Sequence, residues 1–138
     1  MIDELIIPAA LVADLERESR RHAPLEACGL LAGRNGRVEQ FYPLTNADAA
    51  AEHFSMRPEE QFAAIKAMRG LGLRLLAIWH SHPATPARMS EEDLRLAYTP
   101  DALYAIFSLA VPPEQALRAF AVEDGRPREV PVRIETAP

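Results

Sequence analysis

Apolar and polar positions alternate along the chain with a helical period in some segments and as strand-like runs in others. Residues 9–22 place apolar side chains on one helical face and charges on the rest, and Pro24 follows, which predicts a surface helix. Residues 57–72 predict a second helix, because Pro58 suits a first turn and Gly70 suits a helix end.

Strand signals lie in the apolar runs between and after these helices. Two such runs flank Asn35-Gly36, a dipeptide that favours a two-residue hairpin turn. Residues 73–82 are strongly apolar until they end in histidines, which is typical of a strand buried on both faces. We expect a loop over 45–53, a short helix over 90–98, and three closing strands over 102–111, 115–125 and 129–134.

Composition narrows the class of protein. The chain has 138 residues, 49% hydrophobic and 25% charged, with a net charge of −5, so we expect a single domain over residues 1–138 and no nucleic-acid partner. No apolar run approaches the roughly 18 to 20 residues of a membrane span, and the acidic start "MIDELIIPAA" differs from a signal peptide. The one cysteine, Cys28, cannot form an internal disulfide, so we expect a cytoplasmic protein. No pattern indicates an oligomeric state.

Two of the four histidines stand one residue apart at the end of the predicted buried strand. Side chains at positions i and i+2 of a strand point the same way, so His80 and His82 are predicted to face one point. Asp93, in the first turn of the next predicted helix, can return to that point across the connecting loop. Two imidazole nitrogens and a carboxylate oxygen suit Zn²⁺, and three protein ligands leave a fourth position open, as in catalytic zinc sites.

These residues also have ordinary structural interpretations, which the pattern leaves open. A buried histidine is often only a hydrogen-bonded one, although a pair at strand spacing with a downstream carboxylate is harder to explain in that way. Ser90 and Asp93 fit an S-x-x-D capping box. Ser90 is therefore either a helix cap alone or a cap that also serves catalysis.

A hydrolytic zinc site also needs a proton acceptor. Glu26 stands at the beginning of an otherwise apolar segment, where an acid is costly unless it is used, and it is the candidate general base. The alternative interpretation is a solvated strand end. Weaker rivals lie in loops and helix starts, where acids are common: Glu52, Glu59, Glu91 and Glu92.

Taken together, these positions resemble a known motif. Glu26 in "EACGLLAG", then "HSHP", then seven residues, Ser90, two residues and Asp93 resemble the JAMM motif of the MPN-domain zinc metalloproteases, and every position of the motif matches. The order of elements and the short length are similar to the bacterial and archaeal members. The resemblance implies an α/β (α+β) domain with a curved, mostly antiparallel or mixed sheet flanked by helices, similar in layout to cytidine deaminases.

The resemblance also implies a mechanism and a substrate. His80, His82 and Asp93 would bind one zinc ion, and Glu26 would act as general base on a zinc-bound water and then protonate the leaving amine. Ser90 would stabilise the oxyanion. The family cleaves amide bonds, peptide or isopeptide, after the C-terminal Gly-Gly of ubiquitin-like proteins, and its bacterial members are associated with sulfur-carrier proteins.

Two other classes of function remain as alternatives. A non-catalytic MPN scaffold is an interaction module that has lost metal ligands, whereas this chain keeps them all. A zinc deaminase needs H-x-E and P-C-x-x-C, and this chain has neither.

Expectations for the surrounding residues follow from their local sequence. Residues 50–57 are expected to be an exposed edge strand that holds the Gly-Gly tail by β-addition. Cys28 is expected to be a small buried hydrophobe, and the alternative is that it shares the face of Glu26 and lines the cleft. Trp79 is expected to be a core residue that faces away from the histidines. His22 and His53 are expected on the surface or beside the site.

Overall fold

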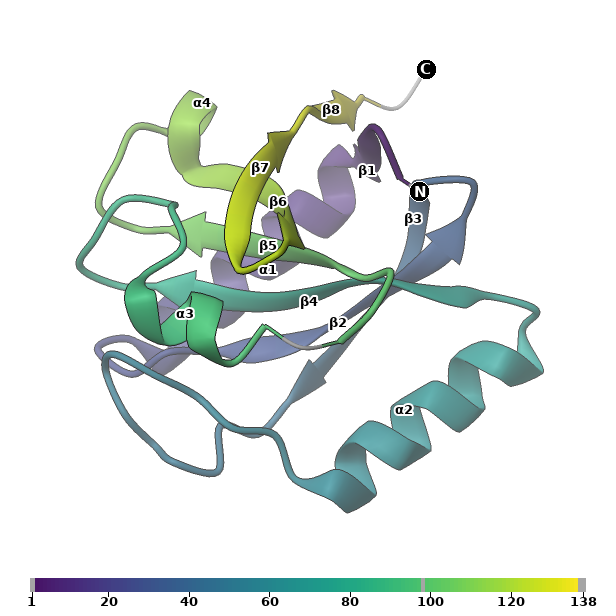
Figure 1. Ribbon diagram of the computed structural model, residues 1–138, viewed down its shortest axis with the longest axis horizontal. Helices are drawn as coiled ribbons and strands as arrows, with labels where there is room; N and C mark the ends of the chain where they lie inside the picture. Colours follow the sequence, from purple (N-terminus) through teal and green to yellow (C-terminus); the bar gives the residue numbers. More distant parts are fainter. Residues whose placement is uncertain (1, 98, 137–138) are drawn as a thin grey trace.

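The computed structural model describes residues 2–97 and 99–136, and eight strands form one mixed sheet within them (Figure 1). The strands are β1 (Leu5–Pro8), β2 (Cys28–Arg34), β3 (Arg37–Leu44), β4 (Arg74–His82), β5 (Leu103–Ser108), β6 (Leu117–Glu123), β7 (Arg126–Val130) and β8 (Val132–Glu135). The helices are α1 (Ala9–His22), α2 (Pro58–Gly70), α3 (Glu91–Arg95) and α4 (Pro113–Ala116). The strand order β7-β6-β5-β4-β2-β3-β1-β8 confirms the predicted mixed sheet flanked by helices.

The middle of the sheet holds β4, the strand that ends in the two histidines. It pairs antiparallel with β2, where Cys28 lies opposite His80, and parallel with β5, where Ser108 lies opposite His82. Because neighbours cover both of its edges, the end of β4 is held in a fixed register.

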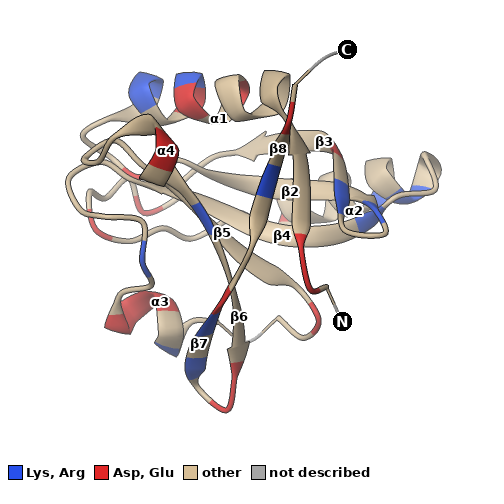
Figure 2. Ribbon diagram, turned by 90° about the horizontal axis from the view of Figure 1, so that it is seen from above, with Lys and Arg blue, Asp and Glu red and all other residues tan. Residues whose placement is uncertain are grey.

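Helices lie on both faces of this central region. Leu30 and Leu31 are neighbours in β2 and therefore point to opposite faces. Leu31 shares an apolar cluster with Leu15 of α1, and Leu30 shares another with Met68 of α2. Figure 2 shows α1 and α3 on opposite sides of the sheet, with acidic residues at the start of α3. No helix in the described segments has both the length and the apolar character needed to cross a membrane.

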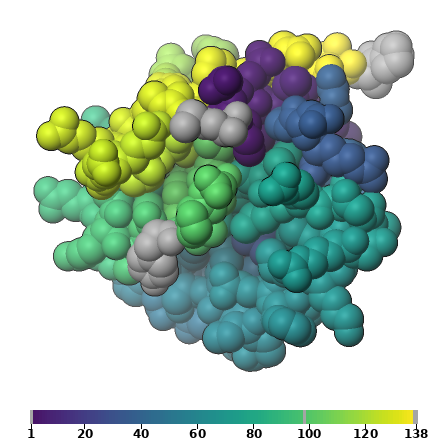
Figure 3. Space-filling view, turned by 45° about the vertical axis from the view of Figure 1, so that its right-hand side comes forward, coloured from purple at the N-terminus to yellow at the C-terminus, as the bar shows by residue number. Residues whose placement is uncertain are grey.

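Most of the predicted elements are confirmed, with shifts at their ends. The Asn35-Gly36 turn joins β2 to β3, and both residues have the positive φ, 53° and 76°, that a type I′ turn requires. The single strand expected over 129–134 is instead two strands that part at Pro131: β7 pairs with β6, and β8 crosses to pair in parallel with β1. Figure 3 shows the N-terminal residues (purple) beside the C-terminal ones (yellow). Neither β1 nor α4 was predicted, since each has only four residues.

The prediction of an edge strand over residues 50–57 is wrong. Only Met56 forms a bridge there, and its partner is Asn46 of the same loop. The Asn46 side chain forms hydrogen bonds with two backbone N–H groups and three backbone carbonyls in and beside this loop. These backbone groups of the loop therefore find their partners locally and not in a neighbouring strand. The outermost strands of the sheet are β7 and β8.

Candidate active site

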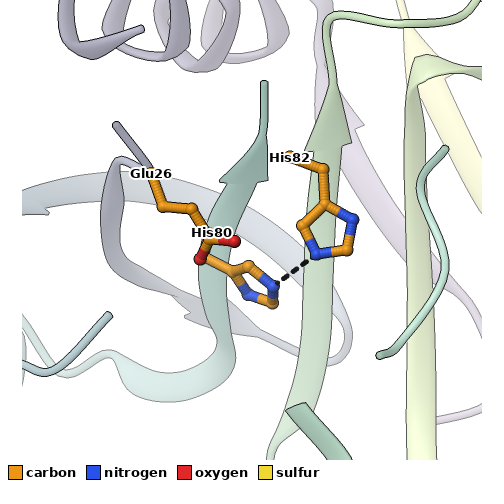
Figure 4. A group of neighbouring side chains, drawn as sticks. All are labelled: Glu26, His80 and His82. Carbon is orange, nitrogen blue, oxygen red and sulfur yellow. Dashed lines mark hydrogen bonds between the residues drawn. The ribbon is translucent and has the colours of Figure 1, made fainter. Parts of the chain in front are cut away.

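The end of β4 presents two buried imidazoles to the same side of the sheet. His80 and His82 expose 1% and 5% of their surface, and their Nε2 atoms lie 3.1 Å apart (Figure 4). This is the arrangement expected for residues i and i+2 of a strand.

Asp93 completes a triangle of donor atoms from the first turn of α3. Its Oδ2 lies 3.3 Å from His80 Nε2 and 3.2 Å from His82 Nε2. In a tetrahedral zinc site with ligand bonds of about 2.0 to 2.1 Å, the ligand atoms are separated by about 3.3 Å. The donor atoms of His80, His82 and Asp93, here called the triad, therefore have the types and spacing that fit a zinc ion.

Contacts behind the triad hold the imidazoles in place. His82 Nδ1 donates to the carbonyl of Pro86 at 2.9 Å, so that in the neutral ring the Nε2 lone pair is directed into the triad. The ring of His80 stacks on Phe54, with ring centroids 4.8 Å apart and planes 26° apart. Among the described residues, His80 Nδ1 has no hydrogen-bond partner.

The capping box predicted at the start of α3 is confirmed. Ser90 Oγ accepts the Asp93 N–H, and the Ser90 N–H donates to Asp93 Oδ2, each at 3.0 Å. The oxygen that accepts the Ser90 N–H is the one that faces the two imidazoles. The cap thus orients the carboxylate of Asp93 towards the two imidazoles, so its capping role is compatible with the predicted role as a metal ligand.

Glu26 lies two residues before β2 and is 3% exposed, which rules out a solvated strand end. One of its oxygens, Oε1, has no hydrogen-bond partner among the described residues. Ligand atoms of Glu26, His80 and His82 all lie within 4.8 Å of one another, and Figure 4 shows the carboxyl group turned towards the imidazoles. Glu26 therefore places a buried carboxyl group with one unpaired oxygen beside the two imidazoles, an arrangement that is costly unless the oxygen is used.

The surroundings of Glu26 and Asp93 shift the pKa values of these two acids in opposite directions. Burial raises the pKa of Glu26 from 4.5 to about 8, and the Asp93 charge adds to the rise, although the charge of His82 opposes it. Burial would also raise the pKa of Asp93, but hydrogen bonds from both imidazoles hold it well below its usual range. Asp93 is therefore an anion that can bind a cation, whereas Glu26 can exchange a proton near neutral pH.

The pKa values of the two histidines are also shifted in opposite directions. Burial lowers the pKa of His80 in spite of its hydrogen bond to Asp93. Burial also disfavours the charged form of His82, but its bonds to Asp93 and to the Pro86 carbonyl raise its pKa overall. Without a metal, a proton on His82 offsets the buried charge of Asp93.

The remaining predictions concern residues around the site. Cys28 is fully buried, and burial raises the pKa of its thiol to about 12, so it is a small hydrophobe as expected. Trp79 is fully buried in the core cluster on the α1 face. His22 pairs with Glu18 on α1, and His53 with Asp48 on the surface loop. The rival acids are exposed at Glu52, Glu59 and Glu91 and half-buried at Glu92.

Sequence reasoning missed Ser81, which stands between the two histidines. Its side chain points away from them, and its Oγ accepts the Ala27 N–H at 2.8 Å while its own N–H donates to the Ala27 carbonyl at 3.0 Å. These bonds tie the residue next to Glu26 directly to the strand of the histidines. The strand period that paired the histidines also indicates that Ser81 faces the other way.

Comparison with known proteins relates this site to one family. The family model "Prokaryotic homologs of the JAB domain" matches residues 8–122. The CysO-cysteine peptidase of Mycobacterium tuberculosis is 38% identical over 94% of this chain and 90% of its own length. The probable TtuB-protein conjugate cleaving protease of Thermus thermophilus is 35% identical over 88% of this chain and 78% of its own length.

A solved structure agrees with these relationships. A protein from Desulfitobacterium hafniense matches with a TM-score of 0.87 and 41% identity, over 96% of this chain and 94% of that one. The family match, the relatives and the fold lead to one assignment. The chain belongs to the prokaryotic JAB-domain family of JAMM/MPN-type peptidases.

Proposed function

We propose that this peptidase is zinc-dependent and hydrolyses the amide bond after the C-terminal Gly-Gly of a ubiquitin-like or sulfur-carrier protein. The observation that carries the proposal is the triad, in which three buried donor atoms of zinc-binding type lie 3.1 to 3.3 Å apart. The buried carboxyl group of Glu26 lies beside them, and its Oε1 has no hydrogen-bond partner among the described residues. When bound, a zinc ion supplies Lewis acidity that polarises a carbonyl group and lowers the pKa of water towards about 7.

The proposed role of Glu26 is to move protons. It takes a proton from the attacking water and delivers it to the leaving amine, so that the amine departs neutral. Burial raises the pKa of Glu26 to about 8 in the metal-free protein. The positive charge of a bound zinc ion would lower this pKa, which favours the carboxylate form that accepts the proton. As a group outside the triad, Glu26 holds no metal in this proposal.

The substrate class is supported by the relatives. One is named a peptidase of a CysO-cysteine adduct and another a protease of TtuB-protein conjugates, so both names describe cleavage of a small protein from a joined group. This chain covers most of the length of each. We propose the same class of substrate here, with the bond after Gly-Gly as the point of cleavage.

A sulfur-carrier protein extended by one cysteine after its Gly-Gly end tests the proposal. Incubation with the zinc-loaded protein is expected to yield carrier ending in Gly-Gly together with free cysteine, as measured by intact mass. A matched carrier with Ala-Ala in place of Gly-Gly is the control and is expected to stay intact. Cleavage of both, or of neither under zinc-loaded conditions, would exclude the proposed specificity.

The catalytic role proposed for Ser90 can be tested separately from its role as the helix cap. Its Oγ accepts the Asp93 N–H, while its own O–H hydrogen is available to an oxyanion. Ser90→Ala is expected to lower kcat by about 10²- to 10³-fold and to destabilise the fold by about 1 kcal/mol. Ser90→Asp keeps a capping oxygen, so it is expected to lose similar activity while retaining the wild-type thermal midpoint. If Ser90→Asp is both stable and fully active, Ser90 is only a cap.

A further inference from the structure

The backbone of Glu26 is fixed although the residue lies outside any strand. Its N–H donates to the carbonyl of Ala50 at 2.8 Å, and its carbonyl accepts the side-chain amide of Asn46 at 3.1 Å. Both partners belong to the loop between β3 and α2, about twenty residues further along the chain. The loop thus holds the residue to which we assign proton transfer.

One side chain organises this loop. The amide nitrogen of Asn46 donates to backbone carbonyls, and its oxygen accepts backbone N–H groups, so its orientation is fixed by its partners. The carbonyls are those of His53 (3.0 Å), Glu26 (3.1 Å) and, more distantly, Ala50 (3.5 Å), and the N–H groups are those of Asp48 (3.0 Å) and Ser55 (3.3 Å).

Asn46 is itself anchored to the rest of the fold. It forms an antiparallel bridge with Met56, next to the start of α2. Its neighbour Thr45 donates its backbone N–H and its hydroxyl to the two carboxylate oxygens of Glu60 on α2, at 2.8 and 2.9 Å. A side chain supported in this way can transmit the position of α2 to the Glu26 backbone.

The same loop contacts the triad from a second direction. Phe54 stacks on His80, and it lies between His53 and Ser55, both of whose backbones bond to Asn46. The amide of Asn46 therefore fixes the chain on each side of the ring that packs against the site.

We infer that Asn46 is a positioning residue, which holds Glu26 at the distance from the triad that proton transfer requires. The inference rests on the proposed function of Glu26 and adds a residue that neither the JAMM-like motif nor the pattern of the sequence singles out. Asn46 touches no reacting atom, and it acts through the carbonyl of Glu26 and the loop that bonds to the Glu26 N–H.

Two substitutions at Asn46 test this role. Asn46→Ala removes all five bonds, and Asn46→Asp keeps the accepting oxygen but loses the donor to Glu26. A displacement of a catalytic group by about 1 Å can cost on the order of 100-fold in rate, so both variants are expected to lower kcat by about 10- to 100-fold with little change in KM. Zinc content is expected to match the wild type.

Asp48→Ala is the matched control. The Asp48 side chain bonds to His53 and Ser55 within the same loop, and neither of these bonds involves Glu26. It is expected to change kcat less than about threefold, in line with a surface substitution. An equal loss of kcat in Asp48→Ala would overturn the inference, because any loosening of the loop would then suffice.

The decisive readout is the coupling between Asn46 and Glu26. If Asn46 acts through Glu26, Asn46→Ala is expected to change the residual rate by less than about twofold when Glu26 is already glutamine. If Asn46→Ala lowers kcat by the same factor with Glu26 and with glutamine at position 26, the inference is overturned. Wild-type kcat in both Asn46 variants would also overturn it. So would a loss of activity that is matched by a loss of the folded protein in thermal unfolding. If Glu26→Gln itself stays fully active, the proposed function of Glu26 fails, whatever Asn46 does.

Discussion

Replacing Glu26 with glutamine is expected to lower kcat by about 10²- to 10⁴-fold. Glutamine keeps the size of the side chain and can hydrogen-bond a water molecule, but it cannot accept a proton. The triad is untouched, so the zinc content is expected to remain at about one ion per chain. Single-turnover cleavage and metal analysis of the same sample measure both quantities.

The expected product of this substitution is a metal-loaded protein that binds its substrate without cleaving it. Glu52→Gln is the matched control, because Glu52 is an exposed acid whose charge also acts on Glu26. It is expected to keep nearly the full rate. If Glu26→Gln loses zinc as well as activity, Glu26 is a metal ligand. If Glu52→Gln is inactive while Glu26→Gln is active, Glu52 is the general base.

Substitution of either histidine of the triad by alanine is expected to abolish cleavage and to weaken zinc binding more than about 100-fold. Partners outside the ligand shell typically contribute about 10- to 100-fold to metal affinity, and a ligand contributes more. Removing His80 or His82 also leaves Asp93 with one imidazole in place of two. Competition with a chromogenic chelator measures the affinity.

His22→Ala is the control for a general loss of histidine. His22 pairs with Glu18 on α1 and belongs to no part of the triad. It is expected to keep zinc affinity and cleavage. If a variant that lacks both triad histidines binds zinc with wild-type affinity, the metal binds elsewhere.

The parts of the site that the sequence predicts are those governed by short periods. The two-residue period of a strand is enough to bring His80 and His82 together, and the three-residue spacing of a capping box is enough to place Asp93 against Ser90. Glu26 stands out because an acid in an apolar run is costly. These patterns are local, so they can be recognised in the sequence without knowledge of the fold.

What the sequence did not predict depends on contacts between distant segments. Asn46 bonds to Glu26 across twenty residues of chain, and no periodicity relates the two positions. Residues 50–57 were predicted to be an edge strand, but the loop satisfies much of its backbone through Asn46 and pairs with no strand of the sheet. The pairing of β8 with β1 likewise joins the two ends of the chain, and four apolar residues are too few to reveal it.

Titration of the metal-free protein with zinc tests the central claim most directly. If the triad holds the ion at which the amide bond is hydrolysed, the rate of cleavage of the Gly-Gly-extended carrier is expected to rise linearly with added zinc and to level off at about one equivalent per chain. Full cleavage by the metal-free protein, or a rate that does not respond to zinc while the protein remains folded, would contradict the account.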